Sequence, residues 1–456
     1  MKKRMCKIMA LAMTAAMVVP MAAQTTAFAA DDKEITYWNI AVESPDKDIV
    51  TAAVDKFNKE TESGYTVNSV AIQNDTYKEK LVIAMSSGEC PDMYSSWSGG
   101  PMYEYIDSGF AQPIDDLLDQ SDVKDKLLDA AIEQGSYKGH VYAIPYMNVV
   151  LAGIFYNKDM FKQYGLEEPK TLADLENICA TLKENGITPF ALANGSKWTG
   201  SMYFMSLAAR YGGLEPFQNA VAGTGKFTDD CFIKAGEKIQ EWVKNGYFPD
   251  GVNSLSEDDG QAKQLLYQET AGMMLGGSFY TGAFQTDSEE FYQKKIGWFP
   301  IPAIDDSDAD PTIQIGTVGD QFISFNCEGD KLAAAFECAA DHLSDEVEDM
   351  IYSTGKIAPV KDAGDHISDP VVKEIFDAAQ EASSIQLWYD QYLPTSVASA
   401  HLDGLQEVFG LTKTPQEAQE EMQTAMDEYL STKSDSGAAD DTAEEATDDA
   451  AADDAE

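Results

Sequence analysis

Two kinds of hydrophobic pattern alternate along this chain from about residue 30 onward. Short runs rich in β-branched and aromatic residues, such as 34–38, 65–72 and 141–144, are typical of strands. Longer segments, such as 49–61 and 171–185, place apolar residues three and four positions apart, which predicts amphipathic helices. Because strands alternate with helices, the sequence predicts an α/β fold in which helices cover the faces of sheets.

The length of this alternating part predicts two lobes. About 400 residues lie between the two ends of unusual composition, and a single hydrophobic core stops growing at roughly 250–300 residues. No linker rich in Pro, Gly or Ser divides them, so we expect the chain to cross between the lobes more than once. Loops at the carboxyl ends of the strands of two such sheets would then face each other across a cleft, where α/β folds usually bind ligands.

The amino terminus has the order of a secretory signal peptide. Basic residues at 2–4 precede an apolar run at 8–21, and small residues flank Phe28 at 27–29. A transmembrane anchor needs about 20 apolar residues or more, so the shorter run favours cleavage. We therefore exclude residues 1–29 from the fold and expect the mature protein to be secreted, at the cell surface or in the periplasm.

The charge of the chain is strongly negative. It carries 78 acidic and 32 basic residues, for a formal net charge of −46, and this charge would repel nucleic acids and anionic lipid surfaces. Residues 435–456 contain ten acidic and no basic residues. Such a composition cannot bury a core, so the sequence predicts a disordered tail at 433–456. A calcium-binding or wall-spacing role for this tail stays open.

The cysteines and histidines indicate neither a metal centre nor a disulfide scaffold. Cys6 lies in the signal peptide, and the five other cysteines form an odd set without CxxC spacing. A pair between Cys327 and Cys338 is conceivable in an exported protein, although isolated buried cysteines are favoured. The four histidines show no metal-ligand spacing. We expect neither a metal nor an organic cofactor.

Motifs of enzymatic chemistry are also missing from the sequence. A run of acids at 306–310 begins like a calcium loop but has Pro311 where glycine is required. The segment 223–227 is too short for a phosphate loop, and there is no GxSxG elbow. A glycosidase needs only two well-placed carboxylates, so the residues alone leave that activity open.

A series of short motifs resembles the extracellular solute-binding proteins, family 1, of bacterial carbohydrate importers. They occur in the family's order and spacing and cover nearly the whole mature chain: YKEKLVIA at 77–84, SGECPD at 87–92, YAIPY at 142–146, FYNKDMF at 155–161, GITP at 186–189, GGSF at 276–279, PIP at 300–302 and GTVG at 316–319. Each is weak alone, but the ordered series is specific.

This resemblance implies the two-lobed periplasmic-binding-protein-like fold of type II. Two hinge strands and a third crossing would join the lobes, with hinges near 145–150 and 298–302. The first lobe would comprise 30–145 and about 302–345, and the second about 150–298 and 346–432. Many relatives in Gram-positive bacteria carry a lipid-modified cysteine after the leader's apolar run, whereas this chain has Ala and Gln there.

Several loops carry residues suited to a sugar. A sugar presents an apolar face of C–H groups and a rim of hydroxyls, so its site needs aromatic platforms with carboxylates and amides. Trp97 and Trp198 lie in loops rich in Gly, Ser and Asn, where a large apolar side chain is otherwise hard to explain. Polar candidates follow predicted strands or precede helices: Asn39, Glu43, Asp75 and Asp320.

The family resemblance adds further positions to these candidates. It places sugar-stacking aromatics at Trp198, Phe279 and Trp388, and polar contacts at Asp320 and Asp390. It also implies that the protein is not an enzyme, that it binds an oligosaccharide by hinge closure as a monomer, and that it delivers this ligand to the permease of an ABC importer. A glycan-active enzyme, a sugar-binding sensor or lectin, and a polyamine or peptide ligand are the alternatives.

Overall fold

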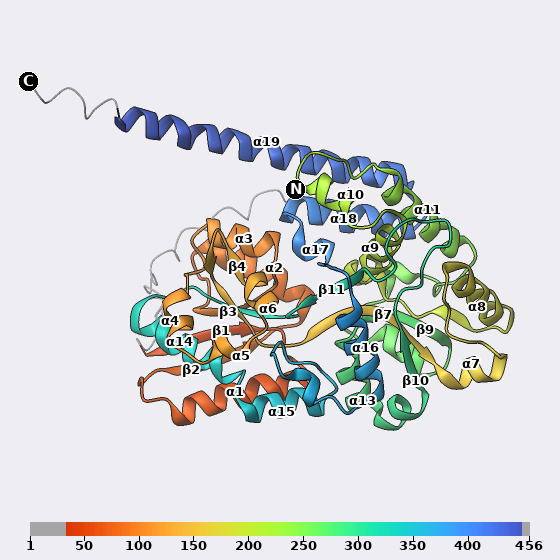
Figure 1. Cartoon of the computed structure of the whole chain (residues 1–456), viewed down its shortest axis with the longest axis horizontal. Coiled ribbons are helices and arrows are strands. Elements are labelled where there is room, and N and C mark those ends of the chain that lie inside the picture. The colour runs from red at the N-terminus through yellow and green to blue at the C-terminus, as the bar shows by residue number, and fades with distance from the viewer. Residues whose placement is uncertain (1–32, 449–456) are drawn as a thin grey trace, which may run out of the picture.

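The computed structural model describes residues 33–448, and their side chains up to residue 433. The predicted signal peptide lies outside the described residues. Two α/β lobes lie side by side, each built on its own sheet (Figure 1). The predicted α/β class is therefore confirmed. No helix in 33–448 is both long and apolar enough to cross a membrane.

The first lobe is built on a five-stranded mixed sheet. Its strand order is β2-β1-β3-β12-β6, and the strands are β1 (Glu34–Asn39), β2 (Thr66–Ala71), β3 (Met93–Ser96), β6 (Ala143–Pro145) and β12 (Phe322–Phe325). Strand β1 pairs in parallel with β2 and β3, whereas β12 is antiparallel to β3 and β6.

Helices cover the first sheet as the hydrophobic periodicity predicts. Helix α1 (Asp46–Glu60) buries Ile49, Ala53 and Phe57, which lie on one helical face. The remaining elements of this lobe are α2 (Asn74–Ser87), α3 (Gly100–Asp107), α4 (Asp115–Asp119), α5 (Val123–Lys126), α6 (Asp129–Gln134), the hairpin β4 (Ser136–Tyr137) and β5 (His140–Val141), α14 (Gly329–Asp341) and α15 (Asp345–Ser353).

The second lobe is organised around β7 (Val149–Asn157), all nine residues of which are buried. Its sheet has the order β13-β11-β7-β9-β8, and β10 also pairs with β7. The other strands are β8 (Thr188–Phe190), β9 (Ala271–Gly277), β10 (Ile296–Phe299), β11 (Gln314–Val318) and β13 (Ile385–Gln386). A strand buried on both faces has a continuous apolar sequence, as β7 does.

Helices pack around this second sheet. They are α7 (Lys158–Tyr164), α8 (Leu172–Glu184), α9 (Trp198–Gly212), α10 (Glu215–Val221), α11 (Asp230–Lys244), α12 (Gln261–Tyr267), α13 (Tyr280–Lys295), α16 (Pro370–Glu381), α17 (Tyr389–Tyr392), α18 (Thr395–Phe409) and α19 (Pro415–Asp448). Short 3₁₀ turns lie at Asn194–Ser196, Val252–Ser254 and Ala363–Asp365.

Within the described residues the chain crosses between the lobes three times. The first crossing joins β6 to β7, at the predicted hinge near 145–150. The second joins β11 to β12, so the hinge predicted at 298–302 is wrong. Both β10 and β11 pair with β7, and the buried guanidinium of Arg210 donates to the carbonyls of Ile301 and Ile313, which holds this segment on the second lobe.

The third crossing also lies later than the sequence indicates. Helix α15 packs against α1, and Leu127 forms a β-bridge with Val360, so the chain remains with the first lobe past residue 346. Helix α16 then contacts β10 of the second lobe. The boundary is displaced because α15 buries its apolar side chains Val347 and Ile351 in the core under α1.

Two further points concern the carboxyl-terminal segment, where the expectation is corrected, and the cysteines, where the favoured interpretation holds. Helix α19 continues to Asp448 (Figure 1), so 433–448 is helical rather than disordered. The segment extends a helix that begins at Pro415, and extending a helix is much less costly than starting one. Residues 449–456 lie outside the described residues. Cys327 and Cys338 do not pair: each described cysteine is a free thiol.

Candidate functional site

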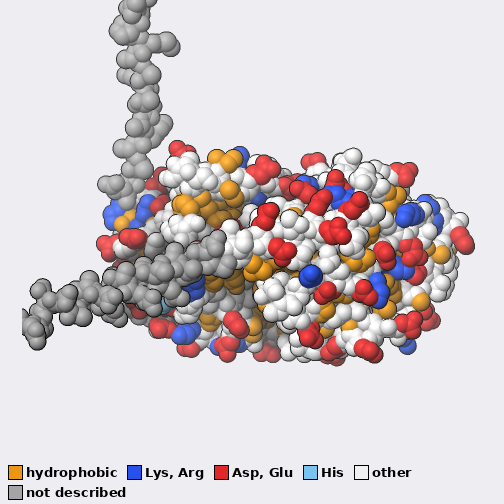
Figure 2. Space-filling model, turned by 90° about the horizontal axis from the view of Figure 1, so that it is seen from above, with side chains coloured by type: hydrophobic (Ala, Val, Ile, Leu, Met, Phe, Trp, Pro, Cys, Tyr) orange, Lys and Arg blue, Asp and Glu red, His pale blue; other side chains and the backbone are white. Residues whose placement is uncertain are grey.

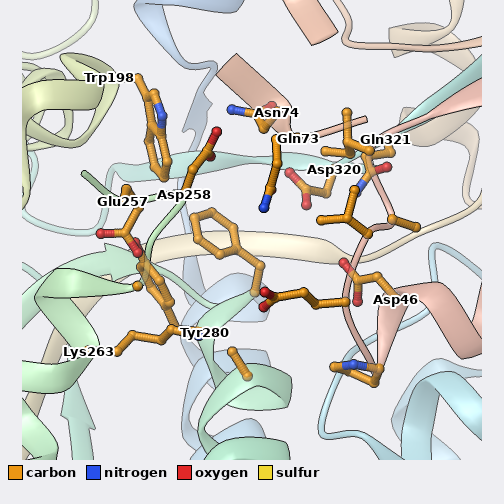
Figure 3. A pocket seen from close by; sticks show the side chains of 18 of the residues that line it. Asp46, Gln73, Asn74, Trp198, Glu257, Asp258, Lys263, Tyr280, Asp320 and Gln321 are labelled. Atoms are coloured by element: carbon orange, nitrogen blue, oxygen red, sulfur yellow. The ribbon is translucent and has the colours of Figure 1, made fainter. Parts of the chain in front are cut away.

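A cavity of about 940 Å³ lies between the lobes. The first lobe lines it with residues 40–46 after β1, with Gln73, Asn74 and Lys78 at the start of α2, and with Trp97 after β3. The second lobe contributes Trp198, the segment 257–264 and the start of α13. Figure 3 shows the labelled side chains of Asp46, Gln73 and Asp320 opposite those of Trp198, Glu257 and Asp258.

Most of the residues that the sequence singles out line this cavity. The seven that do so are Glu43, Trp97, Trp198, Phe279, Asp320, Trp388 and Asp390. They come from segments almost 350 positions apart in the chain. The structure therefore brings together in one cavity residues that were selected from separate loops.

Asn39 and Asp75 are not in the lining. Asn39 is fully buried, where its amide donates to the Ser69 hydroxyl and accepts from the Ala41 backbone N–H. Asp75 lies in the first turn of α2, and its backbone N–H donates to Asp258 Oδ2 at 3.3 Å. Both residues stabilise the segments beside the cavity.

One wall of the cavity is aromatic. The rings of Trp198 and Phe279 meet edge to face, with centroids 6.1 Å apart, and the indole N–H of Trp198 has no hydrogen-bond partner within the described part of the chain. Phe279 depends on Gly277, since a Cβ there would lie 2.3 Å from its Cε1. Trp388 is only 2% exposed and packs in the second lobe's core beneath this wall.

Trp97 forms part of the facing wall. Its ring meets Tyr77 edge to face at 6.0 Å, and the Lys78 ammonium lies 5.0 Å from its ring centroid. The turn after Trp97 approaches the second lobe closely: Gly99 has φ 121°, and a Cβ there would lie 2.3 Å from the Gln391 carbonyl oxygen. Only glycine permits this approach.

Carboxyl groups dominate the polar part of the lining. Its acidic residues are Glu43, Asp46, Glu257, Asp258, Asp259, Asp287, Asp320 and Asp390, and its basic residues are Lys78, Lys263 and Lys356. Amide side chains of Gln73, Asn74, Gln264, Gln321 and Gln391 complete it. This mixture of amides, carboxylates and aromatic faces is suited to hydroxyl-rich ligands.

Three of these carboxyl groups have raised pKa values. Burial raises the pKa of Glu257 to about 8, and its Oε2 is shielded from solvent without a hydrogen-bond partner in the described structure. Burial also raises the pKa of Asp320 to about 7, although the nearby Lys356 opposes the shift. The pKa of Asp258 is raised by burial and then by the charge of Asp75.

The two lobes contact each other around the cavity. Lys78 Nζ lies 3.7 Å from Asp390 Oδ2, and the bond from the Asp75 amide to Asp258 joins α2 to the second lobe. Thr281 Oγ1 donates to the Gly355 carbonyl at 2.6 Å. These bonds describe an arrangement in which the lobes have approached each other.

Several residues that line the cavity were not predicted from the sequence. The run 257–259 looks like an ordinary acidic turn before a helix, and Lys78, Lys263 and Lys356 look like solvated surface lysines. Asn74, the neighbour of the candidate Asp75 in the first turn of α2, lines the cavity although Asp75 does not. No local pattern marks such residues, because their position depends on how the lobes approach each other.

The described residues contain no cluster of three or more His, Cys, Asp or Glu side chains arranged to hold a metal ion. The side chains that line the cavity offer hydrogen bonding, aromatic stacking and charge. Those are the interactions through which proteins bind small polar ligands reversibly.

Residues 41–340 match the family model described as bacterial extracellular solute-binding protein. The chain belongs to this family. The two-lobed architecture and the interlobe cavity agree with the predicted periplasmic-binding-protein-like fold, and the resemblance seen in the short motifs is confirmed.

Two relatives support the assignment of this chain to the solute-binding family. An uncharacterised ABC transporter extracellular-binding protein of Pyrococcus horikoshii is 31% identical over 229 residues, 50% of this chain and 50% of that protein. The multiple sugar-binding protein of Streptococcus mutans is 29% identical over 180 residues, 39% of this chain and 37% of that protein. The chain thus matches half or less of the length of these two relatives.

A solved structure matches over a larger region. It comes from a study of xylan utilisation by the thermophilic bacterium Caldanaerobius polysaccharolyticus and is 29% identical, with a TM-score of 0.78. The match covers 86% of this chain and 99% of that one. The two-lobed fold is therefore shared over nearly all the described residues.

Proposed function

We propose that this solute-binding protein captures an oligosaccharide outside the cytoplasm and delivers it to the permease of an ABC importer. The observation that carries the proposal is the interlobe cavity, where the aromatic wall of Trp198 and Phe279 faces a rim of amides and carboxyl groups. Apolar C–H faces of sugars stack on such rings, while sugar hydroxyls hydrogen-bond to the rim. The multiple sugar-binding protein of Streptococcus mutans supports a carbohydrate ligand.

The lobes supply the mechanism of capture. A ligand that contacts Trp97 on one lobe and Trp198 on the other binds the closed form more tightly than the open form. The ratio of these two affinities determines how far the ligand shifts the equilibrium toward the closed form. The permease would recognise the closed arrangement, and no bond of the ligand is broken. The predicted aromatic positions Trp198, Phe279 and Trp388 and the polar positions Asp320 and Asp390 form the proposed site, together with Glu43 and Trp97.

A thermal-shift and calorimetric screen of the purified mature protein tests this proposal. The panel contains neutral malto-, xylo-, manno-, fructo- and raffinose-type oligosaccharides, with spermidine and short peptides as controls. We expect a concentration-dependent rise in Tm with one glycan class and the same glycan recovered intact after incubation. A response confined to spermidine or peptides would overturn the sugar assignment, and degradation of the glycan would indicate an enzyme.

A further inference from the structure

The charge balance of the cavity points to the class of glycan that it takes. Each lysine in the lining already pairs with a carboxylate: Lys78 with Asp390, Lys263 with Asp287 at 2.9 Å, and Lys356 with Asp46. Five carboxyl groups of the lining have no cation within ion-pair distance among the described residues, namely Glu43, Glu257, Asp258, Asp259 and Asp320. No arginine or histidine lines the cavity in the described structure.

These carboxyl groups come from both lobes. Glu257 and Asp258 lie on the second lobe's wall, and Asp320 lies across the cavity beside Gln321 at the second crossing (Figure 3). The lysines of the lining are each paired with a carboxylate, so the charge that remains is negative. A cleft with such an excess of one sign of charge concentrates the electrostatic potential between its low-dielectric walls. The outer surface adds to this potential, since carboxylates are more widespread than cationic groups on the face shown in Figure 2.

We propose that the cleft takes uncharged oligosaccharides and rejects those carrying uronate, sulfate or phosphate groups. The inference rests on the proposed function and narrows its substrate class. The unpaired carboxyl groups accept hydrogen bonds from sugar hydroxyls. These bonds replace the hydrogen bonds to water that the groups lose when the lobes close. An anionic substituent offers no donor to those of these groups that are ionised. Glu257, whose pKa burial raises to about 8, is mainly protonated at pH 7 and adds no charge to the cleft.

An anionic sugar would also have to break an existing ion pair. To neutralise a uronate, Lys78 would have to leave Asp390, or Lys356 would have to leave Asp46, and the abandoned carboxylate would remain in the same cavity. Removing one partner of a partly buried ion pair is costly. Like charges brought together at an interface add a further penalty.

Matched pairs of glycans test the proposal by calorimetric titration at pH 7 and low salt. One pair is xylotetraose and xylotetraose bearing a single glucuronic acid. The other is maltotetraose and maltotetraose with one residue oxidised to a uronate. We expect the neutral member of whichever pair binds to have an affinity at least about thirtyfold higher, a ratio in keeping with like-charge repulsion in a cleft.

The outcomes separate this inference from the proposed function. Equal or tighter binding of the acidic member would overturn the charge selectivity and leave the sugar assignment intact. If no member of either pair and no glycan of the wider screen binds, the sugar assignment fails and the selectivity falls with it.

Variants of the cavity provide a second test. The double variant Asp258→Asn/Asp259→Asn removes two carboxylates, and the amide oxygen introduced at position 258 can still accept the bond from the Asp75 backbone N–H. We expect the neutral-to-acidic affinity ratio to fall at least about fivefold. The control Asp305→Asn/Asp306→Asn removes the same charge from an exposed turn outside the cavity and should leave the ratio unchanged. Equal ratios in both double variants would contradict the proposal.

Discussion

The carboxylate of Glu104 on α3 of the first lobe accepts two hydrogen bonds from Thr395, the first residue of α18 in the second lobe. The Thr395 backbone N–H lies 3.0 Å from Oε1, and its hydroxyl lies 2.5 Å from Oε2. The first amides of a helix have no partner within it and carry partial positive charge. Glu104 thus caps a helix of the opposite lobe and links the two lobes beside the cavity.

Removing this contact should weaken ligand binding. In Glu104→Ala the closed form loses a helix cap worth about 1 kcal/mol, so sugar affinity should fall about fivefold, and the ligand-free protein should have a larger radius of gyration by small-angle scattering. Glu104→Gln keeps an acceptor for the Thr395 amide and should retain most of the affinity. An unchanged affinity and radius in the alanine variant would show that the contact does not affect closure.

The aromatic wall should contribute a large part of the binding energy. Trp198→Ala removes the ring that meets Phe279 edge to face and the unpartnered indole N–H, so affinity should fall at least about tenfold, consistent with the contribution of buried aromatics at binding sites. Tyr164→Ala, outside the cavity on the same lobe, is the control. Calorimetry of both proteins, with circular dichroism to confirm the fold, decides whether Trp198 belongs to the site.

Gly277 should be needed for the position of Phe279. In Gly277→Ala the added methyl group would lie 2.3 Å from the Phe279 ring and 2.9 Å from Val150 Cγ1, so the ring must move relative to the cavity. Affinity should fall about tenfold, while the second variant Phe279→Leu should show how much of that loss comes from the ring itself. If Gly277→Ala binds as the parent does, Phe279 is not a wall of the site.

Glu257 should make the stability of the protein fall as pH rises. Its folded-state pKa is about 8 and its unfolded value is about 4.3, so the folded state holds more protons between these values and is progressively destabilised from about pH 4.5 to 8. Glu257→Gln should remove this contribution and raise the free energy of unfolding by about 1–2 kcal/mol at pH 8, discounted for the adjacent cavity. Urea denaturation of both proteins at pH 5 and pH 8 measures it. An equal effect of the substitution at both pH values would contradict the pKa.

Arg210 should stabilise the second lobe strongly. Its guanidinium is 3% exposed and donates to Ile301 and Ile313 carbonyls at 2.7 to 3.1 Å. Arg210→Leu leaves these carbonyls without donors, which should cost about 2–4 kcal/mol. Urea denaturation gives the loss, and Arg210→Lys should recover only part of it because an ammonium cannot span both carbonyls. A loss below about 0.5 kcal/mol, the level of an ordinary surface substitution, would mean that the loop is held by other contacts.

The sequence predicted the parts of this protein that depend on local pattern. Helix α1 and strands β1 and β2 follow from their hydrophobic patterns, and Trp198 was recognised because a large aromatic is unusual in its loop. The hinge at 298–302 was misplaced because Pro300 and Pro302 do end a strand, yet the next strand returns to the same sheet. That return is made by the pairing of β11 with β7 and by the hydrogen bonds of Arg210, which are long-range contacts that no local pattern records.

The candidate site was likewise predictable where local sequence determines it, and not where long-range contacts do. Asn39 and Asp75 have suitable chemistry at suitable strand and helix ends, but the Asn39 side chain forms its hydrogen bonds within the first lobe. Conversely, burial raises the pKa of Glu257, and the short acidic run at 257–259 does not reveal that burial. The aromatic residues of the cavity could be selected from sequence, whereas its charge balance required the arrangement of both lobes.

The position of β12 has a consequence for the biogenesis of the protein. This strand lies between β3 and β6 in the first sheet, yet it follows the greater part of the second lobe in the sequence. A nascent chain therefore cannot complete the amino-terminal lobe until about three quarters of the polypeptide has been synthesised. The sheet of the first lobe therefore stays incomplete through most of synthesis, and the two lobes cannot fold one after the other in the order of the sequence.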